Sequence, residues 1–309
     1  MLRLCLIVIA GLALPALAEG QSVQWLSNAK QGVSKAKSTG LPIMFYITGS
    51  RRDADDLKKA QDQAFRDPLV RAMVRERFIP VRLPLSTTTR DLLAQMNVPG
   101  AAQFSIVVAT SKGRSVGIIG PAQIRNPRML VQQMTTLFRK YRKEMFDTEL
   151  KPKLEKADAR PGDLIKALRV IDKFVIPEAD ETVAKLLERD KLTKTVKKEI
   201  YDTLATLSTQ RSVEALLEVI TQDKLAATAL GKCTPAAAEQ MLPDLDPERP
   251  GRFQVVYDAV TKICKIKGTK SQGFFQNKDA ALINKEIERV KGEVVKAAES
   301  WRRRYEAYR

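Results

Sequence analysis

The 309-residue chain contains no histidine, and this absence excludes several common kinds of active site. Without an imidazole there is no histidine-dependent hydrolase triad, histidine metal site or imidazole proton shuttle. Cysteine is scarce as well, and beyond the N-terminal segment only Cys233 and Cys264 remain. These two thiols could pair in an oxidising compartment, but they do not form a C-x-x-C motif. We interpret both as small apolar core residues with helical patterns around them.

Long apolar runs are also missing, apart from one that extends from Leu4 to Leu14. Arg3 precedes this run, and small residues at cleavage spacing, Ala16 and Ala18, follow it, as in a signal peptide. The run is too short to span a bilayer, and no later stretch approaches the roughly 20 apolar residues of a membrane helix. We therefore predict a signal peptide over residues 1–18, cleaved after Ala18, and a secreted or periplasmic protein without a transmembrane span. An uncleaved N-terminal anchor is the alternative.

Basic residues exceed acidic ones, with 53 Lys and Arg against 36 Asp and Glu and a net charge of +17. The excess lies mostly in residues 19–150, which hold 21 basic and 11 acidic residues, against 31 and 25 in residues 151–309. Such a surface attracts anionic polymers, lipid headgroups or acidic proteins. Simple solubility accounts for the charge equally well.

The N-terminal part alternates between helical and strand patterns, which is typical of an α/β sandwich. The compact apolar run at residues 41–47, LPIMFYI, predicts a buried central strand. The remaining patterns predict strands at 78–85, 104–109 and 115–119, and helices at 24–38, 51–65, from 68 onward, 91–96 and 126–141.

Several segments of this region are similar to the thioredoxin-like family of exported proteins. They are Trp25, GLPIMFYITGS, FIPVRLPL, MNVPGAAQFSIVV and SKGRSVGIIGP, within residues 22–142. In that family the first strand is followed by G-S-x-x-C-x-x-C, and the two cysteine positions correspond here to Asp53 and Asp56. The cis-proline that faces the dithiol corresponds to about Ala102. The resemblance thus implies a redox-inactive thioredoxin-like domain, because a carboxylate cannot replace a thiolate in disulfide exchange.

The carboxylates at these positions have a structural interpretation. Asp53, Asp55 and Asp56 stand at an expected helix start, where a carboxylate accepts unpaired backbone N–H groups. A cation site is the functional alternative, although the spacing of an EF-hand is absent. The neighbouring Arg51 and Arg52 are candidate contacts for an anion or a partner, against the alternative of a solvated loop. We predict no metal and no cofactor.

Strand patterns disappear after residue 145. Residues 146–162 contain two prolines and read as a linker between a thioredoxin-like domain at 19–145 and an all-α domain at 163–309. Helical patterns occur at 162–174, 179–189, 193–207, 212–221, 224–230, 234–241, 253–265 and 279–308, with capping Ser or Thr expected at Thr193, Ser212 and Thr234. Their spacing suits either HEAT-like helical repeats or an irregular helical bundle.

Residues 266–278, IKGTKSQGFFQNK, are expected to form an exposed basic loop. Lys267, Lys270, Phe274 and Phe275 are candidate partner contacts, because aromatics among lysines can stack on bases or sugars. The alternative is that the two phenylalanines pack onto their own domain.

These features predict an exported, non-catalytic protein-binding or scaffold protein with protein partners in the cell envelope, and the basic excess favours acidic ones. One alternative is a polyanion-binding envelope protein. The other is a thiol-dependent chaperone or isomerase helper that uses Cys233 and Cys264.

Overall fold

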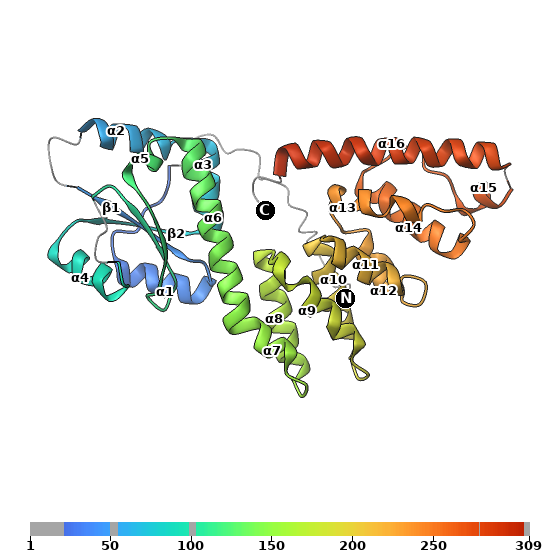
Figure 1. The fold of residues 1–309 in the computed structure, drawn as a ribbon, viewed down its shortest axis with the longest axis horizontal. Coiled ribbons are helices and arrows are strands. Elements are labelled where there is room, and N and C mark those ends of the chain that lie inside the picture. Colours follow the sequence, from blue (N-terminus) through green and yellow to red (C-terminus); the bar gives the residue numbers. More distant parts are fainter. Residues whose placement is uncertain (1–21, 50–54, 99–102, 278, 306–309) are drawn as a thin grey trace, which may run out of the picture. The chain divides into compact units, whose positions relative to one another are not determined.

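The computed structural model describes residues 22–49, 55–98, 103–277 and 279–305 (Figure 1). The chain divides into two compact units, residues 1–141 and 142–309. This division lies close to the boundary expected at residue 145. The first unit is mixed α/β and the second is helical, so the structure agrees with a sheet domain followed by a helical region.

The first unit contains a four-stranded sheet in the order β2-β1-β3-β4. Its strands are β1 (Ile43–Thr48), β2 (Ile79–Pro84), β3 (Ile106–Ala109) and β4 (Ser115–Ile119). Strand β2 runs parallel to β1, whereas β3 is antiparallel to both β1 and β4. The parallel pair needs a crossover connection, and the helices between β1 and β2 supply it. All four strand patterns in the sequence are confirmed.

Helices cover both faces of this sheet: α1 (Ala29–Thr39), α2 (Asp55–Ala64), α3 (Pro68–Arg77), α4 (Thr87–Gln95), α5 (Pro121–Ile124) and α6 (Pro127–Met145). Phe45 of β1 faces a core that includes Ala36 of α1 and Leu93 of α4. The adjacent Tyr46 points to the opposite face and contacts α2, since side chains alternate along a strand. A central strand buried on both faces explains its continuous apolar run.

Local capping corrects three expected boundaries. Trp25 lies before α1 rather than within it, because Asn28 caps that helix and accepts the N–H of Lys30 at 2.8 Å. Helix α4 begins at Thr87 instead of residue 91, because Ser86 accepts the N–H of Thr89. Helix α11 starts at residue 210 with Thr209 as its N-cap, so the cap expected at Ser212 is wrong.

The second unit is a succession of helices. They are α7 (Lys151–Glu155), α8 (Pro161–Phe174), α9 (Asp180–Lys185), α10 (Lys194–Leu207), α11 (Gln210–Val219), α12 (Lys224–Leu230), α13 (Pro235–Gln240), α14 (Pro250–Ile263), α15 (Gln272–Asn277) and α16 (Ala280–Tyr305). Thr193 and Thr234 stand at the expected N-caps of α10 and α13. Much of the expected linker is helical as well, because α6 continues through a π-helical turn at Phe146–Leu150 into α7. Buried Phe146, Leu150 and Leu154 hold this segment to its unit.

These helices stack in consecutive pairs. The members of each pair are in contact: α7 with α8, α9 with α10, α11 with α12, and α13 with α14. Successive odd-numbered helices from α7 to α13 also touch, as do successive even-numbered helices from α8 to α14. Helix α16 packs on α13 and α14 at the end of the series (Figure 1). Among the described residues, no helix is both long enough and apolar enough to cross a membrane.

Candidate functional site

The positions that the resemblance aligns with a dithiol and its facing proline are only partly described by the structure. Asp53 and Ala102 lie outside the described residues, as do Arg51 and Arg52. Asp56 is exposed in the first turn of α2. The expected juxtaposition of these residues therefore stays a prediction.

A buried glutamine joins β1, α2 and the approach to β3. Gln61 of α2 is fully buried, and its Oε1 accepts the hydroxyl of Tyr46 at 2.6 Å. Its Nε2 donates to the carbonyl oxygens of Phe104 at 3.0 Å and Pro121 at 3.3 Å. Burial raises the pKa of Tyr46 to about 12, so its hydroxyl remains a hydrogen-bond donor at neutral pH. These bonds fix α2 against the sheet.

An arginine and two aromatic rings pack around Tyr46. The guanidinium carbon of Arg82 lies 5.3 Å from the ring centroid of Trp25 and 5.2 Å from that of Tyr46. Its Nη2 lies 2.9 Å from the carboxylate of Asp62. Phe65 packs against both Trp25 and Tyr46, at centroid distances of 5.0 and 5.1 Å. The sequence pattern does not reveal this cluster, because it predicts Trp25 in a helix and Arg82 in the strand at 78–85.

The basic loop in the second unit is anchored by its backbone. Tyr257 donates its hydroxyl proton to Glu286 at 2.7 Å and accepts the N–H of Lys270 at 2.8 Å. Arg289 binds both oxygens of the Glu286 carboxylate, at 2.7 and 2.8 Å, and also donates to the carbonyl oxygen of Lys267 at 3.3 Å. The expected open loop is thus held in place, and its last part is helix α15.

The two phenylalanines of this segment have different surroundings. Phe275 lies edge-to-face with both Phe253 and Tyr257, at centroid distances of 4.8 Å. Phe274 stacks outside it at 5.2 Å, with the ammonium of Lys270 5.5 Å from its ring centroid. Both phenylalanines are half-buried. Phe275 therefore packs onto its domain, and Lys270 and Phe274 form an adjacent cation–aromatic pair.

Cys233 and Cys264, the cysteines among the described residues, lie in the second unit. Cys233 is buried and Cys264 is half-buried, and neither takes part in a disulfide in the described part of the chain. Burial raises the pKa of Cys264 to about 11. The nucleophile in disulfide exchange is the thiolate, so this cysteine is poorly reactive at neutral pH.

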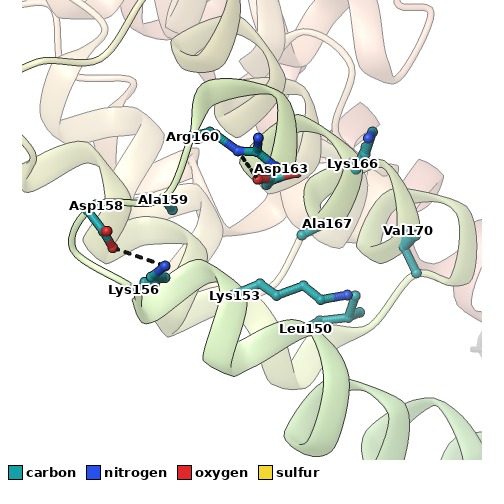
Figure 2. Close-up of a pocket in the computed structure, with 10 residues that line it drawn as sticks. All are labelled: Leu150, Lys153, Lys156, Asp158, Ala159, Arg160, Asp163, Lys166, Ala167 and Val170. Atoms are coloured by element: carbon teal, nitrogen blue, oxygen red, sulfur yellow. Dashed lines mark hydrogen bonds and ion pairs between the residues drawn. The ribbon is translucent and has the colours of Figure 1, made fainter.

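One candidate site is a pocket of about 620 Å³ between α7 and the beginning of α8. Its residues come from the end of the π-helical turn, from α7, from the loop 156–160 and from the first turns of α8. They are Leu150, Lys153, Lys156, Asp158, Ala159, Arg160, Asp163, Lys166, Ala167 and Val170 (Figure 2). Four of these side chains are cationic and two are carboxylates.

Two ion pairs lie within this pocket (Figure 2). Nζ of Lys156 lies 3.4 Å from the carboxylate of Asp158, and Nε of Arg160 lies 2.8 Å from that of Asp163. The hydrogen bond with Arg160 holds the pKa of Asp163 below its usual value, and the nearby charges of Lys166 and Lys153 act in the same direction. The pocket is therefore positive at neutral pH and suits an anionic group.

Sequence analysis missed this pocket because residues 146–162 were interpreted as a linker. The available signal was the recurrence of Lys153, Lys156, Arg160 and Lys166 around a Pro-Gly helix start. That spacing places several cations on adjoining helical turns only if the segments before and after the loop at residues 156–160 are both helical.

A second pocket, of about 490 Å³, has the opposite charge. Glu214, Glu218 and Asp244 are in its lining, together with Arg252. Nε of Arg252 lies 2.7 Å from the carboxylate of Asp244. Among the described residues there is no cluster of carboxylates and cysteines that could hold a metal ion.

Comparisons of the chain with protein families, curated proteins and solved structures gave no match.

Proposed function

We propose that the chain is an exported, non-catalytic binding or scaffold protein, in which a redox-inactive thioredoxin-like domain precedes a HEAT-like helical array. The observation that carries the binding role is the stacking of helix pairs from α7 to α14. Stacked pairs create an extended surface along which a partner can bind. The order of elements and the β2-β1-β3-β4 sheet support the thioredoxin-like assignment of the first unit.

The chemistry of the thiols supports a role without disulfide exchange. The positions that correspond to the dithiol carry Asp53 and Asp56. Cys233 and Cys264 are in the other unit, and the raised pKa of Cys264 keeps that thiol protonated at neutral pH. A thiol-dependent helper function would require rapid alkylation of Cys233 or Cys264 in the native protein. We expect mass spectrometry to show slow alkylation of both at pH 7.5, with full labelling in denaturant.

Restoring the dithiol tests the proposed domain directly. The parent chain should not reduce insulin disulfides above background. The double variant Asp53→Cys, Asp56→Cys should form an intramolecular disulfide and gain reductase activity, because it recreates C-x-x-C at the corresponding positions. The matched control is the double variant Asp53→Ser, Asp56→Ser, which should stay inactive. Activity of the parent would refute the non-catalytic role, and failure of the cysteines to pair would refute the correspondence.

Export is part of the same proposal. Residues 1–21 lie outside the described residues, and the basic Arg3, the apolar run and the small residues at the cleavage spacing support cleavage. N-terminal sequencing of the protein recovered from the secreting host should begin at Glu19. A chain that still begins at residue 1 would contradict cleavage.

Polyanion binding is a second candidate function, favoured by one observation. Lys267 and Lys270 are exposed, and Lys270 stands beside the ring of Phe274. Binding of this kind weakens steeply with salt, because it releases counterions. The chain should be retained on heparin at low salt, and retention should fall in the variant Lys267→Gln, Lys270→Gln. Absence of retention at low salt would exclude this function.

A further inference from the structure

The pocket between α7 and α8 combines an apolar side with a cationic one. Leu150, Ala167 and Val170 are in the pocket lining and form its apolar side, with Val170 half-buried and the other two buried. Lys153, by contrast, is exposed at the same pocket, and Figure 2 shows its side chain extending toward Leu150. A ligand that fills the pocket therefore meets a positive charge and a hydrophobic surface together.

The positive charge of the pocket is only partly neutralised by the protein itself. Lys156 and Arg160 are paired with Asp158 and Asp163. Lys153 and Lys166 also line the pocket, and neither forms an ion pair with any residue that the structure describes. An anionic ligand can thus bind these ammonium groups without first breaking an internal ion pair.

The composition of the lining selects among anionic ligands. A densely charged polyanion would bring further negative groups against the carboxylates of Asp158 and Asp163. A wholly apolar ligand would take the Lys153 ammonium out of water without a partner, which is costly. A peptide that places carboxylates next to apolar side chains satisfies both surfaces, and the volume of about 620 Å³ lies in the range of pockets that enclose ligands.

We propose that this pocket binds an acidic segment of a protein partner, with a carboxylate on Lys153 and an adjacent apolar side chain on Leu150, Ala167 and Val170. The inference rests on the proposed protein-binding function and specifies the chemistry of the partner. It does not depend on the thioredoxin-like assignment, so the dithiol experiment and the experiment below can fail separately.

Fluorescence anisotropy with short labelled peptides tests this proposal on the full chain. The probe is the peptide GLEELDFG, and two peptides with the same label serve as comparisons. GLQQLNFG removes the charge, and GSEESDSG keeps the charge but removes the apolar side chains. Unlabelled heparin hexasaccharide serves as a competitor at about 150 mM salt, where long-range electrostatic attraction is screened.

Two charge reversals then locate the binding site. Lys153→Glu should weaken binding of GLEELDFG at least about tenfold, as removal of a central contact does. Lys285→Glu, an equal change of charge at an exposed position of α16 outside the pocket, should leave the affinity within about twofold. Circular dichroism of both variants should match that of the parent, which separates loss of binding from loss of structure.

The relative affinities of the peptides and the effects of the two variants decide whether the pocket binds an acidic, partly apolar segment. The proposal is supported if GLEELDFG binds more tightly than both comparison peptides and if only Lys153→Glu weakens it. It is overturned if GSEESDSG binds equally well and heparin displaces the probe, since the site then recognises polyanions. It is also overturned if GLEELDFG does not bind, or if both variants lose the same affinity. If Lys153→Glu alters the circular dichroism spectrum, Lys153→Gln replaces it under the same criteria.

Discussion

Replacing Gln61 with leucine should destabilise the first unit strongly. The native carboxamide accepts one hydrogen bond and donates two, all in a fully buried position. Leucine has a similar size but leaves the Tyr46 hydroxyl and the carbonyl oxygens of Phe104 and Pro121 without this partner. Each buried polar group that loses its partner costs about 1–3 kcal/mol.

The apolar gain of leucine offsets part of this loss. Burial of a leucine side chain contributes about 2 kcal/mol. We therefore expect the net free energy of unfolding of the first unit to fall by about 3 kcal/mol, since the lost hydrogen bonds outweigh the burial term. The matched control is Gln63→Leu, an exposed position on the same helix, which should change stability by less than about 0.5 kcal/mol.

Urea unfolding followed by tryptophan fluorescence measures this difference. Trp25 is in the first unit and Trp301 in the second, so a Trp301→Phe background makes the signal report on the first unit. The Trp25 ring lies 5.5 Å from that of Tyr46 and is close to the perturbed residues. Equal unfolding midpoints for Gln61→Leu and Gln63→Leu would refute the assignment of a stabilising role to these hydrogen bonds.

Two further predictions concern a glycine and a carboxylate. Gly32→Ala should lower the free energy of unfolding by about 1–3 kcal/mol through overpacking, because the new Cβ would lie 2.5 Å from Cγ2 of Val81. The control Gly292→Ala, where the space is open, should instead stabilise its helix by about 1 kcal/mol. Thermal or urea unfolding that showed the same sign for both variants would contradict this prediction. The hydrogen bonds of Arg289 hold the pKa of Glu286 below its ordinary value of 4.5, so the stability that the carboxylate provides should be fully present above pH 4.5 and be lost as the pH falls through the folded-state pKa. Urea midpoints of the parent and Glu286→Gln should therefore converge in acid, and a gap that widened there would refute the sign.

Regular elements were the most predictable part of this protein. The apolar run around Phe45 identified the central strand, since a strand buried on both faces contains few polar residues. Strand β4 has the expected bounds, and so does α12. Helix boundaries were harder to predict where the capping side chain is not marked by the periodicity of apolar residues, as with Asn28, Ser86 and Thr209.

The candidate sites were less predictable, because they depend on which helices become neighbours. The lysines of the α7–α8 pocket lie in a segment whose prolines and charges favour a linker, and buried Leu150 and Leu154 hold it as helix instead. Likewise, Phe274 and Phe275 are equivalent in the sequence. Contact with Phe253 and Tyr257 makes Phe275 a packing residue.

The sequence alone excluded histidine chemistry and indicated an α/β region followed by helices. These conclusions depend only on residue identity and on local periodicity, and both are properties of the sequence itself. Only the tertiary structure decided that helix pairs stack in series and that cations from α7, the following loop and α8 share a pocket. Such groupings arise from packing between neighbouring helices, and local patterns do not specify how those helices pack.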